Sequence, residues 1–310
     1  MEYNYKEFTF PSGDGKSHVF ACLYTPKKQS VRAVIQLVHG MCDHMGRYRE
    51  LAEALCDAGF AVCGNDHLGH GRTARHSDNL GFFSAEDGAD TLITDVHKLT
   101  LLMKTQFGGS PIILVGHSMG SLIARAYACN YYRDIDGAVY LGTTNNAFAG
   151  IAKMLAKIIV NRKGEMYRSK FLNDLVFGSF NRKVERVDPH GRDWLSRDEE
   201  IASRSAVDPY CNFTFTAMAY YDLFVLTARV SGAGWAKDYP KSLPTLVMAG
   251  DRDPVGHMGR DPRAAATRLK KAGASDVTLK LYPGARHELH HETCREEFAA
   301  DLLQWLNARF

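Results

Sequence analysis

The feature that most constrains the fold is a series of short apolar runs separated by longer helical patterns. Several of these runs are continuous rather than alternating, which is typical of parallel strands buried on both faces. Strand and helix alternation of this kind predicts a doubly wound α/β sheet. We expect strands at 18–24, 33–38, 60–65, 112–116, 137–141, 245–249 and 277–282, and helices at 47–58, 85–107, 122–132, 262–272 and 293–307.

Two stretches depart from this alternation. Residues 13–16, Gly-Asp-Gly-Lys, are a turn signal between two early strands and predict an opening antiparallel hairpin. Residues 145–241 contain helical patterns but no good strand. We therefore expect an α/β core made of residues 1–144 and 242–310, and a helical cap, or lid, made of residues 145–241.

One helix of the predicted cap is amphipathic. Apolar residues recur at helical spacing, with lysines on the other side. One interpretation is that its apolar face packs on the sheet domain, and the other is that it lines an apolar substrate tunnel or touches a lipid surface. The apolar residues are Ile151, Met154, Leu155, Ile158 and Ile159, and the lysines are Lys153 and Lys157.

Composition excludes several classes of protein. The 310 residues are 45% hydrophobic, as in ordinary globular proteins, which excludes a mainly disordered chain. There are 38 Lys and Arg against 35 Asp and Glu, a net charge of +3, without the clustered surplus of a nucleic-acid binder. No signal peptide or run of ~18 apolar residues is visible, so we expect a soluble, cytoplasmic protein. Seven cysteines without a Cys-x-x-Cys pair predict reduced thiols.

Residues 116–120, Gly-His-Ser-Met-Gly, point to a catalytic nucleophile. They follow a predicted strand and precede a helical run, which is the context that a Gly-x-Ser-x-Gly nucleophile elbow requires. The serine of such an elbow sits on a tight, strained turn, so its neighbours must be small. We therefore predict that Ser118 is the nucleophile. Met119 should supply one backbone N–H to the oxyanion hole, and Met41, in the loop after an earlier strand, should supply the other.

The acid and the base of a serine hydrolase should follow in the order Ser, acid, His. Asp251 and Asp253 both lie on the loop after the strand at 245–249. We favour Asp253 as the acid, which leaves Asp251 as a turn residue that binds backbone. His287 follows the last strand and is favoured as the base, with His290 and His291 as its rivals.

Residues 287–291, His-Glu-Leu-His-His, also match the His-Glu-x-x-His zinc motif. That motif binds zinc when it lies on a helix with a third ligand nearby. Here Pro283 and Gly284 come just before it, and the serine elbow already accounts for His287. We therefore predict neither a metal nor a cofactor for the reaction.

These residues together resemble the α/β-hydrolase superfamily, and more narrowly its monoacylglycerol lipase and lysophospholipase branch, often grouped with serine-aminopeptidase-like hydrolases. Residues 39–48, His-Gly-Met-Cys-Asp-His-Met-Gly-Arg-Tyr, are similar to that branch's His-Gly-x-x-Glu-His-x-x-Arg-Tyr signature, with Asp43 in place of the usual Glu. Residues 66–71 resemble its Asp-x-x-Gly-His-Gly loop, and residues 116–120 match its elbow. The resemblance covers nearly the whole chain outside the cap.

The resemblance implies an eight-stranded, mostly parallel sheet with a helical cap inserted after the sixth strand. It also implies a triad of Ser118, Asp253 and His287, and oxyanion N–H groups from Met41 and Met119. The leading hypothesis is hydrolysis of carboxylic esters of single-chain acyl lipids, such as a monoacylglycerol or a lysophospholipid, through an acyl-enzyme.

Two other functions stay open. An aminopeptidase or amidase on the same triad would need a cap carboxylate to hold a free amine. A non-catalytic hydrolase-fold binding protein would have no need of a complete triad. For partners we expect a small acyl ester, no nucleic acid and a transient contact of the cap with a lipid surface. The candidate carboxylates are Glu185, Asp188, Asp208 and Asp222, and the aromatic residues that either wall an acyl tunnel or form plain cap core are Phe213, Phe215, Tyr220, Tyr221 and Phe224.

Overall fold

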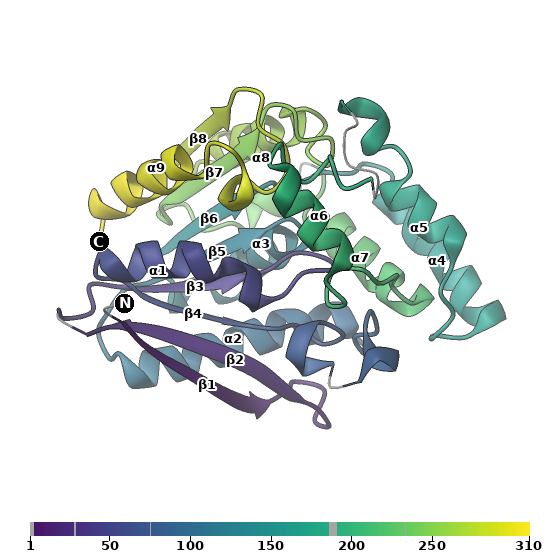
Figure 1. The fold of residues 1–310 in the computed structure, drawn as a ribbon, viewed down its shortest axis with the longest axis horizontal. Coiled ribbons are helices and arrows are strands. Elements are labelled where there is room, and N and C mark those ends of the chain that lie inside the picture. Colours follow the sequence, from purple (N-terminus) through teal and green to yellow (C-terminus); the bar gives the residue numbers. More distant parts are fainter. Residues whose placement is uncertain (1–2, 28, 75, 186–190, 233) are drawn as a thin grey trace.

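The computed structural model describes residues 3–27, 29–74, 76–185, 191–232 and 234–310 (Figure 1). The strands are β1 (Tyr3–Pro11), β2 (His18–Pro26), β3 (Val34–Val38), β4 (Ala61–Asn65), β5 (Ile112–His117), β6 (Gly137–Leu141), β7 (Thr245–Gly250) and β8 (Val277–Tyr282). They form one sheet in the order β1-β2-β4-β3-β5-β6-β7-β8. β2 is antiparallel to both of its neighbours, and every other neighbouring pair is parallel.

Helices cover both faces of this sheet. The α-helices are α1 (Arg49–Asp57), α2 (Gly88–Gln106), α3 (Met119–Tyr131), α4 (Ala149–Lys163), α5 (Lys170–Phe177), α6 (Glu199–Val207), α7 (Ala217–Arg229), α8 (Arg260–Lys271) and α9 (Arg295–Asn307). α1 and α9 pack on one face, and α2, α3 and α8 pack on the other. The 3-10 helices are Met45–Tyr48, Gly71–Thr73, Ser77–Asn79, Tyr132–Asp134, Asn181–Lys183, Trp235–Lys237 and Leu289–His291.

The predicted sheet is confirmed. All seven predicted strands are present with ends within two residues of the prediction, and the opening hairpin pairs β1 with β2. β3 explains why its apolar run is continuous. Val34 and Val38 enter the hydrophobic cluster on one face of the sheet, whereas Ile35 and Leu37 enter the cluster on the other. A strand buried on both faces has no polar side to alternate with.

A helical cap follows β6, as expected. The described residues between 145 and 241 form α4 to α7 and no strand, and Figure 1 shows α4 and α5 at one side of the molecule, beyond the ends of the strands. One buried side chain from α3 contacts the backbone just before this insertion and at the end of α7. The Arg125 guanidinium donates to the backbone carbonyl of Thr144 at 2.6 Å and to that of Val230 at 3.3 Å. Arg125 therefore ties the start of the insertion and the end of its helix α7 to the core.

The prediction that the apolar face of α4 packs on the sheet domain is wrong. The residues that α4 buries are small, and they contact α7 rather than the sheet: Ala149, Ala152, Ala156 and Val160. Alanines let two helix backbones approach closely, so α7 packs against the alanine-rich face of α4. The larger side chains turn outward, and Ile151, Met154 and Ile158 are 55%, 58% and 43% exposed.

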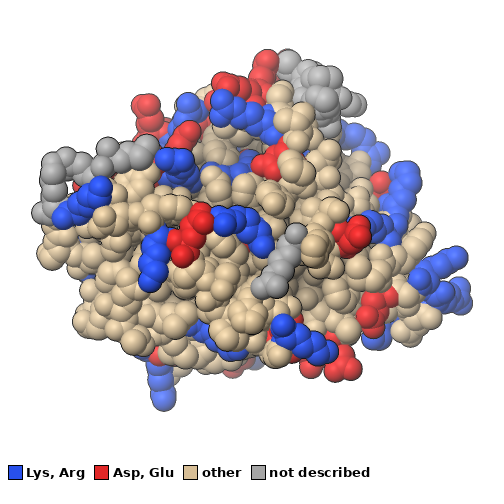
Figure 2. All heavy atoms as spheres, turned by 60° about the horizontal axis from the view of Figure 1, so that its bottom comes forward, with Lys and Arg blue, Asp and Glu red and all other residues tan. Residues whose placement is uncertain are grey.

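The rest of the surface is mixed in charge. Figure 2 shows acidic and basic side chains interspersed over one face, in keeping with the small net charge. All seven cysteines lie in the described part of the chain, and none forms a disulfide. None of the helices in the described ranges combines the length and apolar character that crossing a membrane requires.

Candidate active site

Ser118 lies at the sharp turn between β5 and α3. Its backbone has φ 53° and ψ −119°, a left-handed conformation that is strained for a residue with a side chain. The Ser118 N–H donates to the Leu141 carbonyl at the end of β6, at 2.9 Å. This bond fixes the turn above the carboxyl ends of the central strands, where open α/β sheets commonly place their ligands.

Both glycines of the turn are needed because backbone atoms pass close to them. A Cβ atom on Gly116 would clash with the Gly120 carbonyl oxygen, and a Cβ atom on Gly120 would clash with the Val38 carbonyl oxygen. Backbone atoms cannot move aside as a flexible side chain can. The motif therefore reflects the close approach of α3 to β3 as well as the strain at the serine.

The two backbone groups predicted for the oxyanion hole both border the cavity that contains Ser118. Met119 is the first residue of α3, so its N–H has no acceptor within the helix. Met41 lies in the loop after β3, and its neighbour Gly40 lies against the Ser118 side chain. Among the described residues, neither the Met41 N–H nor the Met119 N–H donates a hydrogen bond. Both donors are thus available to a ligand.

A buried histidine holds the loop that carries Met41. The N–H of Cys42 donates to His70 Nε2 at 3.2 Å, and His70 Nδ1 lies 3.0 Å from the Leu68 carbonyl oxygen, to which it donates. Burial lowers the pKa of His70 to about 3, so the ring is neutral and Nε2 keeps its lone pair. His70 therefore fixes the loop that carries Met41 through the neighbouring Cys42.

The structure brings Asp253 and His287 together. His287 Nδ1 lies 2.9 Å from Asp253 Oδ2, and both side chains are buried. Asp253 Oδ1 accepts from the N–H of Val255 at 2.8 Å, which fixes the carboxylate. His287 and Ser118 border the same cavity. This arrangement can orient an imidazole toward a serine hydroxyl and stabilise the imidazolium form.

The electrostatics of His287 suit a base that accepts a proton. Burial lowers the pKa of His287, but the neighbouring carboxylates, Asp253 first, raise it by more, so its pKa lies above the ordinary 6.5. The indole ring of Trp194, from the cap, lies with its centroid 5.4 Å from that of the His287 ring. Trp194 therefore shields the imidazole on the cap side.

The rival residues occupy other places. Asp251 accepts a hydrogen bond from the Gly284 N–H at 2.8 Å, which is the backbone-binding role expected for it. His290 is buried against the Tyr48 ring, with centroids 4.5 Å apart. His291 Nδ1 lies 3.0 Å from Glu288 Oε2. Within the His-Glu-x-x-His match, only residues 289–291 form a short 3-10 helix, so the helix that a zinc site of this type needs is not present there.

Sequence reasoning missed a buried ionic network beneath the site. Arg47 donates to both Glu288 oxygens at 2.8 and 2.6 Å and to Asp43 at 3.1 Å. Burial opposes ionisation of Asp43, but Arg47 and His117 hold its pKa well below the usual range. Tyr48 donates to Asp43 at 2.7 Å. The signature at residues 39–48 could have indicated this network, because it links the loop carrying Met41 to the residue after His287.

A cavity of about 320 Å³ lies between Ser118 and the cap. Its volume falls within the range of small-molecule sites. Of the predicted tunnel residues, Ile151, Leu155 and Phe224 line it, whereas Phe215 and Tyr220 are fully buried core. Sequence analysis did not identify the other large apolar and aromatic residues by which residues 145–241 line the cavity. These are Phe148, Leu175, Val176, Phe177, Phe180, Trp194, Leu195 and Leu223.

Comparisons with known proteins agree with this geometry. Residues 29–294 match the family described as serine aminopeptidase, S33. The chain is 28% identical over 302 residues to the monoacylglycerol lipase of Mycolicibacterium smegmatis, covering 95% of each chain. It is 28% identical over 276 residues to the monoglyceride lipase of Homo sapiens, covering 87% of this chain and 80% of the human protein.

Solved structures show the same architecture. The crystal structure of a thermostable carboxyl esterase from Bacillus coagulans, in complex with glycerol, superposes with a TM-score of 0.92 at 31% identity, and 98% of each chain is covered. The family match spans most of the chain, and the superposition shows that the fold is shared with the carboxyl esterase. The chain therefore belongs to the serine aminopeptidase S33 family of α/β hydrolases, and it is a carboxylic-ester hydrolase.

Proposed function

We propose that the protein hydrolyses esters of single-chain acyl lipids, with Ser118 as nucleophile, His287 as base and Asp253 as the acid that orients it. The observation that carries the proposal is the buried His287–Asp253 pair, whose histidine borders the same cavity as Ser118, a cavity that is apolar on its cap side. The relatives named monoacylglycerol lipase support the same substrate class.

In this proposal Ser118 Oγ attacks the ester carbonyl as its proton passes to His287 Nε2. The negative charge that develops on the carbonyl oxygen would be held by the N–H groups of Met41 and Met119. The proton then goes to the leaving alcohol, and an acyl-enzyme remains on Ser118. Water activated by His287 releases the fatty acid and restores the serine.

The lining of the cavity favours an uncharged head group over a phosphate. Among the described residues, the acids that border the cavity are Asp43 and Glu288, and it has no lysine or arginine in its lining. A phosphate would find no lysine or arginine there, whereas a glycerol head group can bond to Thr144 and Asn146, which also border the cavity. We therefore favour a monoacylglycerol over a lysophospholipid.

We also propose residues 145–241 as the cap that forms the acyl side of this cavity. Ile151, Leu155, Leu223 and Phe224 come from its helices α4 and α7. The outward face of α4 would touch the lipid from which the substrate comes. Its exposed apolar residues are Phe148, Ile151, Met154 and Ile158.

Among the described residues, the aminopeptidase alternative finds no cap carboxylate at the site. Asp222 is buried against α2, and Asp208 borders a different cavity. Glu185 is exposed and does not border the site, and Asp188 lies outside the described residues. No described cap carboxylate borders the Ser118 cavity, so a free amine would have no such partner there.

Hydrolysis rates on a matched panel test the proposal. The panel contains a long-chain monoacylglycerol, a lysophosphatidylcholine, a short-chain butyryl ester and an aminoacyl amide, with Ser118→Ala as the blank. We expect the monoacylglycerol to be cleaved fastest and the variant to be inactive while keeping the circular dichroism of the wild type. Fastest cleavage of the amide would overturn the substrate class, and full activity of Ser118→Ala would overturn the nucleophile.

A further inference from the structure

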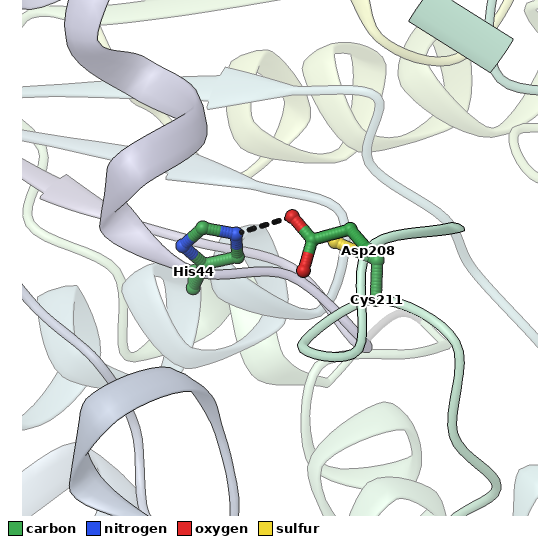
Figure 3. A group of neighbouring side chains, drawn as sticks. All are labelled: His44, Asp208 and Cys211. Carbon is green, nitrogen blue, oxygen red and sulfur yellow. Dashed lines mark hydrogen bonds and ion pairs between the residues drawn. The ribbon is translucent and has the colours of Figure 1, made fainter. Parts of the chain in front are cut away.

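A second cluster of reactive side chains lies on the other side of the loop after β3. His44, Asp208 and Cys211 each offer one atom, and these atoms all lie within 4.8 Å of one another (Figure 3). His44 Nε2 and Asp208 Oδ2 are 3.0 Å apart. His44 comes from the core, whereas Asp208 and Cys211 come from the segment between α6 and α7 of the proposed cap.

We propose that His44, Asp208 and Cys211 form a binding site for a zinc-type divalent ion, which joins the cap to the core. One nitrogen, one carboxylate oxygen and one sulfur are the donors that zinc and cobalt prefer. Calcium and magnesium need several oxygens, and the cluster has a single carboxylate to offer. A water molecule would complete the tetrahedron.

The distances are close to those that such an ion requires. Zinc–ligand bonds of about 2.0–2.3 Å place tetrahedral ligands roughly 3.3–3.8 Å apart. The three atoms lie within 4.8 Å of one another, so movements of about 1 Å suffice to bring them around one ion. Asp208 and Cys211 are three residues apart on one segment, and the Cys211 N–H donates to the Asp208 carbonyl oxygen at 3.0 Å, which fixes their spacing.

An ion can reach the cluster from solvent. Asp208 borders a second cavity, of about 260 Å³, and the side chains of His44 and Asp208 are 17% and 28% exposed. Arg47 and Arg204 also border this cavity, but their charges are balanced by Glu288 and Glu200 respectively. Because both arginines are paired with glutamates, they leave no unbalanced positive charge to repel a cation that enters this cavity.

Binding of the ion would move one proton on His44 and release another from Cys211. Without an ion, the Gly46 N–H donates to His44 Nδ1 at 3.2 Å, so Nε2 carries the proton and donates to Asp208. With an ion on Nε2, that proton moves to Nδ1 through solvent, and the bond from Gly46 is given up. The Cys211 thiol releases its proton to solvent as its sulfur binds.

The ion would hold the cap beside the oxyanion loop. Met41 lies three residues before His44, and the thiol of Cys42 donates to the Phe213 carbonyl of the cap at 3.3 Å. An ion on His44 and Cys211 would add a second tie between the same two segments. We therefore expect the ion to stabilise the folded protein by resisting separation of cap and core.

Cobalt titration of the untagged protein tests the site, because thiolate coordination gives Co²⁺ a charge-transfer absorption in the near ultraviolet. We expect one Co²⁺ per chain, with this absorption present in the wild type and in Cys294→Ser and absent in Cys211→Ser. Zn²⁺ should displace the Co²⁺ and raise the thermal unfolding midpoint of the wild type and of Cys294→Ser. Cys294 is the matched control because it is a half-buried cysteine at the N-cap of α9, remote in sequence from the cluster.

A second variant keeps the test decisive if Cys211→Ser does not fold. Asp208→Asn keeps an oxygen to accept from the Tyr210 N–H but loses the ligand charge, so Co²⁺ affinity should fall at least ~10-fold. The proposal is overturned by wild-type protein without the thiolate absorption, or by equal affinity in Asp208→Asn. Ser118→Ala should bind Co²⁺ like the wild type, so failure of this site is distinguishable from failure of the proposed function.

Discussion

The His287–Asp253 pair is where a change of one atom should matter most. Asp253 accepts from the Val255 N–H with one oxygen and contacts His287 with the other. Replacing it with Asn puts an N–H₂ group where the imidazole needs an acceptor. The ring would then take the wrong tautomer for accepting the Ser118 proton.

We predict that Asp253→Asn lowers kcat for the best ester by about 10³–10⁴-fold while KM changes little. Steady-state kinetics with Ser118→Ala as the blank measure this. Asp251→Asn is the matched control, because Asp251 lies on the same loop but binds only the Gly284 N–H. Its kcat should stay within about tenfold of the wild type. A larger loss for Asp251→Asn than for Asp253→Asn would reverse the assignment.

The dependence of kcat/KM on pH should also report the interaction between Asp253 and His287. The base must be neutral to act, so kcat/KM falls as pH drops through the pKa of His287. Because Asp253 raises that pKa, the residual activity of Asp253→Asn should have its acidic limb at lower pH than the wild type. A profile of kcat/KM against pH for both proteins decides this, and an unchanged limb would mean that another group titrates.

At the scale of elements, α3 lies so close to β3 that there is no room for a side chain at Gly120. A methyl group on Gly120 would meet the Val38 carbonyl, whereas one on Gly150 in α4 meets nothing within 4 Å. We predict that Gly120→Ala lowers the free energy of unfolding by about 1–3 kcal/mol or more. Gly150→Ala should leave it equal or raise it by up to about 1 kcal/mol. Urea unfolding of the two variants gives the comparison, and equal effects would contradict it.

The outward face of α4 gives a prediction about substrate delivery. Met154 is exposed and does not border the cavity. We predict that Met154→Asp lowers hydrolysis of a monoacylglycerol held in phosphatidylcholine vesicles by about tenfold, because an apolar contact with the lipid is lost. Hydrolysis of a soluble butyryl ester should not change. The control is Leu101→Asp on α2, also exposed, and an equal effect there would argue against a specific role for α4.

The sequence predicted the sheet well and the cap poorly, for a physical reason. The strands at 112–116 and 245–249 are recognisable because burial on both faces makes them continuously apolar. The orientation of α4 depends instead on which face meets α7, and its alanine stripe is a weaker sequence signal than Ile151 and Met154. Only the fold brings Trp194 to His287, since 93 residues separate them.

At the scale of the whole molecule, the cap meets the core at the buried side chain of Asp222, and one oxygen of its carboxyl group has no hydrogen-bond partner among the described residues. Asp222 of α7 lies against Gly88 at the start of α2, and burial raises its pKa to about 7 from 3.8. A carboxyl group with a raised pKa in the folded state binds a proton on folding between these pH values. The group therefore costs stability progressively as pH rises from about 4 to above 7.

We predict that Asp222→Asn raises the free energy of unfolding relative to the wild type at pH 8, by about 1–3 kcal/mol, and has little effect at pH 4. Denaturant unfolding at the two pH values measures the difference. Asp90 offers a contrast at the same junction, because its ion pair with Arg229 lowers its pKa. Asp90→Asn should lose stability at pH 8, the opposite sign, and a gain there would contradict the argument.

The hydrogen bonds from Arg125 to the carbonyls of Thr144 and Val230 have a consequence for evolution and for protein engineering. One buried side chain contacts the carbonyl just before the insertion and the carbonyl at the end of α7, so the polypeptide between these two carbonyls begins and ends at nearly the same point of the core. A segment anchored in this way adds little loop-closure cost whatever its length. The helices between these two residues can therefore be replaced as one segment by those of another enzyme. Grafting another enzyme's lid between these two carbonyls should change what is hydrolysed while leaving the sheet and the serine turn as they are.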